Sequence, residues 1–188
     1  GEISLVDWLR QYLGRNYVGL IHRLDRNTSG LMVVAKRTKA AQRLTQALQE
    51  GKIFRAYLAW VKGEIKTPIT LRHTLLKNEK TNLVQVVQDT HPKGKTATLK
   101  ATPIKRVTWK NSPITLIELE LETGRSHQIR VQCAHEGHAL LGDKKYGDGQ
   151  GFKRTALHSS KLKFPHPMSG EELSFQSDLP EDIRAPMR

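Results

Sequence analysis

The feature that most constrains the fold is a long strand-rich region in the middle of the chain. Residues 53–61 alternate between apolar and polar side chains, and this run ends at Gly63. Further apolar runs lie at 83–87, 97–101 and 114–121, with Asn, Pro, Gly and Lys residues between them. Alternation interrupted by turn residues is typical of strands that pair with their neighbours in sequence. The region therefore predicts a mainly antiparallel sheet.

Helical patterns lie on both sides of this region. Residues 4–13 carry apolar side chains at helical spacing with Ser4 as the expected N-cap, and a second helix is expected over 39–50, between Thr38 as N-cap and Gly51 as its stop. The remaining expected elements are a buried strand over 31–35, a helix over 126–136 and a strand pair near Leu162 and 173–175. We find no repeat and no linker. The sequence thus predicts one α+β domain over 1–188, with a mixed, mainly antiparallel sheet flanked by helices and loops.

The charge of the chain indicates its class of partner. Its 188 residues include 31 Lys and Arg against 18 Asp and Glu, which gives a net charge of +13 and a pI near 10.0. Such an excess favours a polyanion, and nucleic acid is the commonest one. An anionic membrane surface is the competing partner. However, the basic residues are scattered rather than gathered on one amphipathic helix, and no apolar run approaches the roughly 20 residues that span a bilayer.

The only cysteine, Cys133, rules out an intrachain disulfide and favours a reducing, cytoplasmic location. We expect Cys133 to be structural. The chain opens on Gly1 rather than Met, which suggests a processed product or a fragment of a longer protein.

The stretch from His22 to Leu31, with sequence HRLDRNTSGL, places one carboxylate among basic residues in a segment of turn-forming residues. Nearby cations favour the ionised form of Asp25, which nucleophilic or general-base chemistry requires. The alternative is an Asx-turn or helix-cap aspartate beside solvated arginines. A Ser-His-Asp triad within this stretch is not expected, because triad members normally come from separate segments.

Two further segments combine polar and aromatic residues in ways that suit a site. Tyr57 is a polar aromatic residue in the middle of the strand at 53–61, where a half-buried sheet tyrosine is the alternative. The segment 123–131, with sequence TGRSHQIRV, opens a helix: Gly124 is expected to allow a tight turn, and the N–H groups that follow offer an anion site. Arg125 and Arg130 could equally be solvated arginines.

A metal centre is not expected, although His and Cys residues gather after this segment. An H-E-x-x-H motif would need His at position 139, which is Ala139, and a single cysteine cannot build a zinc ribbon or finger. The residues concerned are His127, Cys133, His135, Glu136 and His138.

The sequence resembles the RluA-type pseudouridine synthases over roughly residues 18–182. The stretch His22–Leu31 is similar to their catalytic motif, and Arg55-x-Tyr57 to a second motif, in which Lys is usual at the first position. The segment 123–130 is similar to a third, and it is followed, as in the family, by Gly-His, Gly-Asp and Tyr-Gly pairs at 137–138, 142–143 and 146–147. Residues 156–159 and 162–167 match the C-terminal pattern.

The resemblance implies roles for individual residues. It makes Asp25 the catalytic residue, and it implies that Arg23 helps to displace the target base. Tyr57 would stack on the uracil and help to remove the proton from carbon 5, while Arg130 would pair with Asp25 and hold it ionised. Leu157 would pack near the uracil. The remaining residues expected to bind RNA are His22, Thr28, Arg125, His127 and Gln128. His158 and His166 are expected to be structural.

The implied activity is the isomerisation of specific uridines to pseudouridine in structured ribosomal or transfer RNA. The reaction needs no cofactor and no metal, and we expect a monomer without a protein partner. Relatives usually carry a strand, and many a small RNA-binding domain, ahead of the position of Gly1, so we expect this chain to lack both. The alternative is a non-catalytic RNA-binding module that retains the fold.

Overall fold

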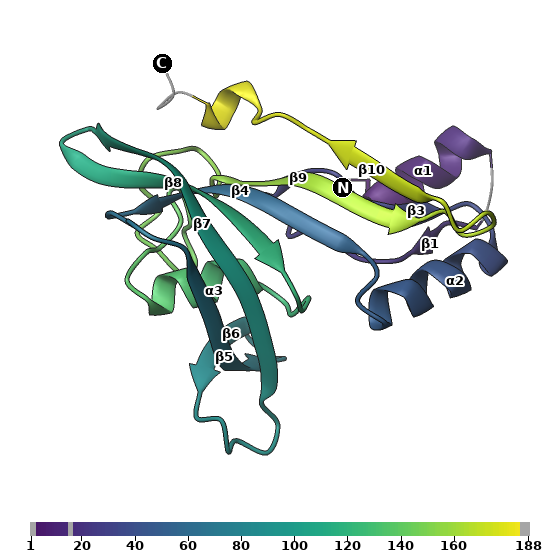
Figure 1. The fold of residues 1–188 in the computed structure, drawn as a ribbon, viewed down its shortest axis with the longest axis horizontal. Helices are drawn as coiled ribbons and strands as arrows, with labels where there is room; N and C mark the ends of the chain where they lie inside the picture. Colours follow the sequence, from purple (N-terminus) through teal and green to yellow (C-terminus); the bar gives the residue numbers. More distant parts are fainter. Residues whose placement is uncertain (1–2, 15–16, 185–188) are drawn as a thin grey trace.

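A computed structural model describes residues 3–14 and 17–184 and shows a sheet with short helices around it. The sheet has eight strands (Figure 1). Seven follow the order β10-β9-β4-β8-β7-β5-β6 in antiparallel pairs, and β2 pairs with β9 in parallel. The strands are β2 (Ser29–Gly30), β4 (Phe54–Lys62), β5 (Ile69–Asn78), β6 (Leu83–Val87), β7 (Lys95–Trp109), β8 (Ser112–Leu121), β9 (Leu157–Pro165) and β10 (Glu172–Gln176).

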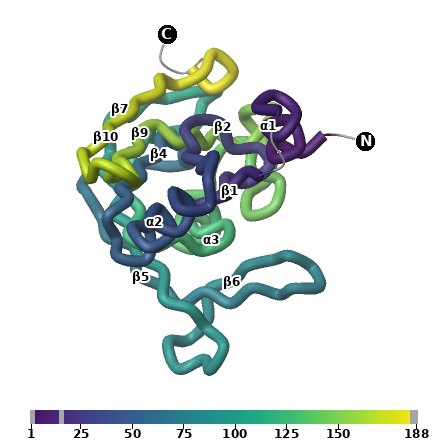
Figure 2. Tube along the Cα trace, turned by 90° about the vertical axis from the view of Figure 1, so that its right-hand side faces the viewer, coloured from purple at the N-terminus to yellow at the C-terminus, as the bar shows by residue number. Residues whose placement is uncertain are grey.

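The other elements lie around this sheet. The short strands β1 (Gly19–Leu20) and β3 (Val34–Ala35) pair with each other, and the remaining elements are α1 (Leu5–Leu13), α2 (Thr38–Gln49), α3 (Gln128–His135) and the 3-10 turn η1 (Glu181–Ile183). Helix α2 contacts β3 and β9, whereas α3 contacts β5 and β6. Seen from the side, β6 and the loops next to it project away from the rest of the chain (Figure 2). The α+β class and the mainly antiparallel mixed sheet predicted from the sequence are confirmed.

Most local predictions hold, and three need correction. The strand expected over 31–35 is only Val34–Ala35, and most of its residues are half-buried, because it pairs with two residues of β1 alone. Arg37, not Thr38, is the N-cap of α2, and no side chain caps that end. Helix α3 begins later than expected, because His127 at its N-cap has a left-handed backbone with φ 52°. Ser4 does cap α1, where its side chain accepts a hydrogen bond from the Asp7 N–H.

Strand β4 lies between two parts of the core, and its alternation assigns each side chain to one of them. Tyr57, Ala59 and Val61 belong to the cluster that includes Ile129 and Cys133 of α3. Trp60 packs on the opposite face, and its indole N–H donates to the carbonyl of Ile183 at 3.0 Å. Because both faces are covered, Tyr57 is a fixed part of the sheet.

A bulge in β9 lies beside the segment that carries Asp25. The pairing of β4 with β9 shifts between Ala56 and Tyr57, which leaves Ser160 of β9 as the extra residue. Strand β2 pairs with β9 at the same place, with Gly30 opposite Ser159. Bulges are common beside active sites because they change the direction of a strand and of its side chains. This bulge therefore positions the Asp25 loop against Tyr57.

Gly30 is required for this docking, and we predict that Gly30→Ala destabilises the protein by at least about 2 kcal/mol. Its φ is +109°, and an added Cβ would lie 2.2 Å from the backbone oxygen of Ser159. Gly51→Ala is the control, because it has a comparable backbone (φ +71°) and nothing within 4 Å of the added Cβ. Urea denaturation measures both variants. If Gly30→Ala and Gly51→Ala lowered the free energy of unfolding equally, then contact with β9 would not require a glycine at position 30.

In the described part of the chain, none of the helices combines the length and the apolar character that a membrane crossing requires.

Candidate active site

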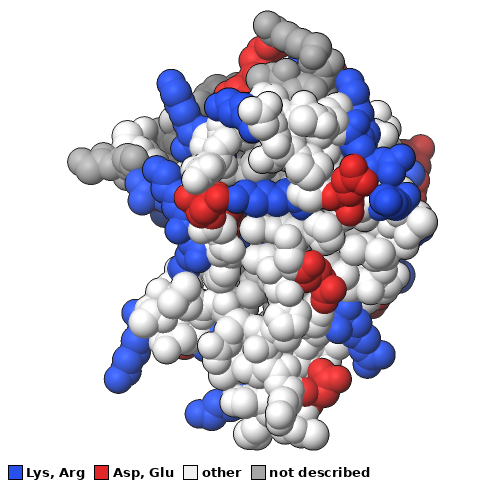
Figure 3. All heavy atoms as spheres, turned by 90° about the vertical axis from the view of Figure 1, so that its left-hand side faces the viewer, with Lys and Arg blue, Asp and Glu red and all other residues white. Residues whose placement is uncertain are grey.

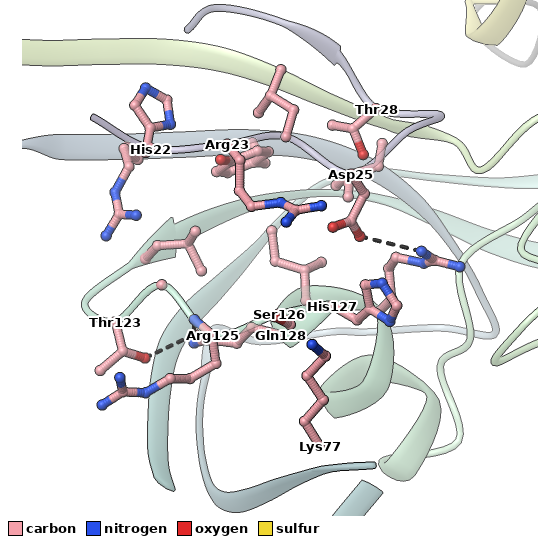
Figure 4. A pocket seen from close by; sticks show the side chains of 18 of the residues that line it. His22, Arg23, Asp25, Thr28, Lys77, Thr123, Arg125, Ser126, His127 and Gln128 are labelled. Carbon is pink, nitrogen blue, oxygen red and sulfur yellow. Dashed lines mark hydrogen bonds and ion pairs between the residues drawn. The ribbon is translucent and has the colours of Figure 1, made fainter. Parts of the chain in front are cut away.

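One pocket of about 760 Å³ contains every site residue predicted from the sequence. Its walls come mainly from the loop at 21–28, strand β4, and the end of β8 with the start of α3, and Leu157 of β9 and the end of α2 also line it. Figure 4 shows Arg23 and Asp25 pointing into the pocket from the upper loop, with Arg125 and His127 on the opposite side. Lys77 comes from the projecting hairpin and closes a further edge. The fold therefore brings together segments that are far apart in the sequence.

Asp25 faces Arg130 across 105 residues of sequence. The Arg130 Nη1 donates to Asp25 Oδ2 at 3.2 Å, and the side chain of Asp25 is 21% exposed. The backbone of Asp25 closes a turn, because its carbonyl accepts from the Thr28 N–H at 2.9 Å. Within the described residues, no hydrogen bond joins the Asp25 carboxylate to a backbone N–H. The carboxylate is thus free of the helix-cap role that the sequence left open and is directed at an arginine in the pocket.

Arg130 also binds a second carboxylate that the sequence analysis did not assign. Its Nε and Nη2 donate to the two oxygens of Asp143 at 2.7 and 2.8 Å, so the bidentate pair of Arg130 is with Asp143 and not with Asp25. The Asp143 side chain is 1% exposed and also accepts from the backbone N–H groups of Lys145 and Tyr146. These bonds hold the guanidinium plane in one orientation, and Nη1 remains for Asp25.

The pKa values in this cluster reflect the pairing. Burial by itself would raise the pKa of the Asp143 carboxyl, but the hydrogen bonds from Arg130 and from the Lys145 N–H lower it below its usual range. Burial likewise opposes the charge on Arg130, but the bonds with Asp143 and Asp25 raise its pKa above the ordinary value. Arg130 and Asp143 therefore form a permanently charged pair behind Asp25.

The loop that carries Asp25 is held at both ends by side chains. The Arg154 guanidinium donates to the Asn27 carbonyl at 3.1 Å and to Ser29 Oγ at 2.9 Å, and His158 Nδ1 lies 2.9 Å from the same hydroxyl. At the other end, His22 Nε2 accepts from the Val33 N–H at 3.1 Å. Burial, with a contribution from nearby Arg55, lowers the pKa of His22 to about 4, so its imidazole is neutral at physiological pH.

Tyr57 and Leu157 form the apolar part of the pocket. Tyr57 is 5% exposed and Leu157 is 4% exposed, and both line the pocket from paired strands. Burial raises the pKa of the Tyr57 phenol above its usual value of 10. A phenol that stays protonated suits stacking on a base better than accepting a proton.

The start of α3 is fixed by hydrogen bonds of side chains that line the pocket. His127 Nδ1 lies 2.7 Å from the Tyr146 hydroxyl, and burial lowers the pKa of His127. The Gln128 side chain is buried, where it accepts from Thr123 Oγ1 and from the Arg125 N–H and donates to the Thr98 carbonyl. Gln128 thus shapes the wall of the pocket.

Gly124 has a different role from the expected one. Its φ lies outside the left-handed region, so no tight turn requires a glycine there. An added Cβ would instead lie 2.7 Å from Nη1 of Arg55. Gly124 therefore allows the close approach of the Arg55 guanidinium from β4, which is a tertiary contact that the sequence pattern could not reveal.

The sequence analysis assigned no role to Arg55 and Lys77, which line the pocket, or to Asp143, which holds Arg130 from behind. Asp143 lies in a Gly-Asp pair that was noted without a role, and Arg55 was noted only as a replacement for Lys. Lys77 gave no signal, because a lysine near a hairpin turn is normally a solvated residue.

The described residues contain one group that could hold a metal ion, and it lies outside the pocket. His73, His135 and Glu136 have potential ligand atoms within 4.8 Å of one another. His73 already contacts Glu136 Oε1 at 2.9 Å and Gln132 Nε2 at 3.1 Å, so hydrogen bonds account for this arrangement. Cys133 is buried, which raises its thiol pKa to about 12 and agrees with the structural role expected for it.

The chain is similar to known proteins over most of its length. A family model described as RNA pseudouridylate synthase matches residues 5–135. Curated relatives include the ribosomal large subunit pseudouridine synthase D of Haemophilus influenzae (37% identity, 88% of this chain and 53% of the relative) and that of Escherichia coli (36%, 88% and 53%). The chain thus spans about half the length of the curated relatives it matches.

Two solved human structures have the same fold. RNA Pseudouridylate Synthase Domain Containing 1 superposes with a TM-score of 0.80 at 26% identity, covering 93% of this chain and 74% of that one. RNA Pseudouridylate Synthase Domain Containing 4 gives a TM-score of 0.79 at 21% identity, covering 100% and 83%.

Proposed function

This chain belongs to the RNA pseudouridylate synthase family, and we propose that it isomerises specific uridines to pseudouridine in structured RNA. The observation that carries the proposal is the line of charges Asp25–Arg130–Asp143 at one pocket that also contains Tyr57. An isomerase that breaks and remakes a bond to the same base needs a fixed reactive group and a flat surface for the detached base. This pocket has a candidate for each.

In the proposed reaction, Asp25 starts cleavage of the bond between ribose and uracil. It acts either by attack on the ribose or the ring, or by removal of a proton from ribose carbon 2. The freed uracil rotates against Tyr57 and Leu157 and rejoins the ribose through carbon 5, and any bond that Asp25 has formed to the ribose or the ring is broken as the uracil is released in its new linkage. Carbon 5 then loses its proton to a base, either Asp25 or water, and the nitrogen that left the ribose takes up a proton, so that no proton is gained or lost overall. Arg130 keeps the Asp25 carboxylate in one position throughout, because Asp143 fixes the guanidinium from behind. No cofactor enters the scheme.

RNA is held by charge and by an extruded base in this proposal. The net charge of +13 attracts phosphates without regard to sequence. On the face drawn in Figure 3, Lys and Arg lie mainly toward the edge and acidic side chains lie between them, so the charge is not uniform. The pocket itself contains the arginines Arg23, Arg55, Arg125 and Arg130. A base in the pocket must leave its stack, and Arg23, which points into the pocket, is placed to occupy the gap.

The relatives are named for the large ribosomal subunit, and we therefore propose ribosomal RNA as the first substrate to test, with transfer RNA second. The monomeric state, the absence of a protein partner and the cytoplasmic location remain predictions from the sequence. The interpretation of residues 1–188 as a catalytic domain is likewise a prediction.

The test is to incubate the chain with unmodified large-subunit ribosomal RNA and to measure pseudouridine by nucleoside chromatography. We predict conversion of a small number of uridines, at sites that stay the same as the enzyme concentration rises. Unmodified transfer RNA in a parallel reaction distinguishes the two substrate classes. Tight RNA binding without any pseudouridine on either RNA would favour the non-catalytic module.

A further inference from the structure

Among the residues that the structure describes, Arg55 is a buried cation without an ion-pair partner. It is 7% exposed and lies in β4, two residues before Tyr57 and on the same side of the strand. Its Nε is buried and has no hydrogen-bond partner. Within residues 3–14 and 17–184, no carboxylate forms an ion pair with it. Arg55 therefore differs from Arg130 and Arg154, which are bound by Asp143 and Asp182.

A buried guanidinium in this state reduces the stability of the folded chain. Removing a charge from water is costly unless a counter-charge and hydrogen bonds replace the lost hydration, and arginines in protein interiors are normally paired. The pKa of Arg55 reflects this cost, because burial lowers it and no carboxylate is among the influences on it. A residue that costs stability in the free protein is retained where a ligand supplies the missing charge.

The surroundings of Arg55 keep it available to the pocket. Arg55 lines the pocket together with Asp25, Tyr57 and Gly124. A Cβ at position 124 would lie 2.7 Å from its Nη1, so the glycine leaves room for the guanidinium beside the 123–127 loop. Burial lowers the pKa of Arg55, and an electrostatic interaction with Tyr57 acts in the opposite direction. The guanidinium thus lies beside the aromatic ring on which the base would stack.

We propose that Arg55 is the binding residue for a backbone phosphate of the RNA strand that enters the pocket. The inference depends on the proposed function for the identity of the anion, whereas the need for an anion follows from the burial of Arg55 alone. A guanidinium with free N–H groups matches the oxygens of a phosphodiester and can donate two parallel hydrogen bonds to it. Arg55 would bind the phosphate next to the uridine and so fix its ribose relative to Asp25.

The test is Arg55→Met, which keeps most of the side-chain length and removes the charge. We expect RNA affinity to fall about five- to tenfold at 0.1 M salt, and the slope of log affinity against log salt to become shallower by about 0.7–0.9, as for one lost phosphate contact. We also expect the melting temperature to stay unchanged or to rise, because the variant removes an unpaired buried charge. Arg55→Lys keeps the positive charge, so it should restore the slope of log affinity against log salt.

Arg154→Met is the matched control for stability. Its guanidinium is bound by Asp182 and Ser29, so its loss should lower the melting temperature. The proposal would be overturned if Arg55→Met lowered the melting temperature as much as Arg154→Met does. It would also be overturned if Arg55→Met left the slope of log affinity against log salt unchanged. Arg55 would then be a structural residue. Titrations in an Asp25→Asn background keep the RNA chemically unchanged. If the unaltered chain forms no pseudouridine but Arg55→Met still changes the slope, then the isomerase proposal fails and the phosphate site stands.

Discussion

Asp25→Asn should lower the rate of pseudouridine formation by at least about 10³-fold and leave RNA binding within about twofold of the unaltered chain. The substitution keeps the size of the side chain and its ability to accept from Arg130 Nη1, which lies 3.2 Å from Asp25 Oδ2. It removes the negative charge, without which the group can neither attack carbon nor accept a proton. RNA affinity should rise slightly, if it changes at all, because a cationic pocket loses its opposing charge.

Single-turnover rates and binding titrations on the same RNA measure the two effects separately. Asp148→Asn is the control, because Asp148 pairs with Lys62 on the surface and does not line the pocket. This control should keep full activity. If Asp25→Asn lost RNA binding in proportion to activity, then Asp25 would act mainly in forming the complex, and the chemical role proposed for it would be wrong.

Arg130→Lys should lower the single-turnover rate by about 10²-fold and destabilise the protein by about 1–3 kcal/mol. The guanidinium serves two carboxylates at once, through Nε and Nη2 to Asp143 and through Nη1 to Asp25. An ammonium is a single compact donor group and cannot keep this geometry on both sides. Asp143, which is 1% exposed, would lose one of its bonds and part of its charge compensation.

Urea denaturation and single-turnover kinetics on Arg130→Lys measure the two losses. Arg43→Lys is the control, because Arg43 is exposed and donates to the Pro167 carbonyl away from the pocket. It should change neither quantity measurably. Near-normal turnover in Arg130→Lys would show that the orientation of Asp25 does not depend on a guanidinium, and would remove Arg130 from the proposed catalytic group.

The sequence predicted the elements whose pattern is local. Strand β4 was recognised because its alternation and the stop at Gly63 depend on adjacent residues, and Ser4 was recognised as a cap because capping acts across three residues. The start of α3 was misplaced because His127 adopts a left-handed backbone, and it also hydrogen-bonds Tyr146 nineteen residues away. Pairing of β3 with two residues of β1 shortened the strand expected at 31–35.

For the site, the motifs identified Asp25, Tyr57 and Arg130 as candidates, and the fold placed all three in one pocket. The sequence alone determined which residue types were available and the periodicity of the segments that carry them. The tertiary structure decided which residues became partners. It made Asp143, rather than Asp25, the bidentate partner of Arg130. It also placed Gly124 next to Arg55, which has no ion-pair partner among the described residues. The reason is physical, because a charge is paired or left unpaired according to which strands meet in space, and such contacts join residues far apart in the sequence, such as Asp25 and Arg130 at a separation of 105 positions.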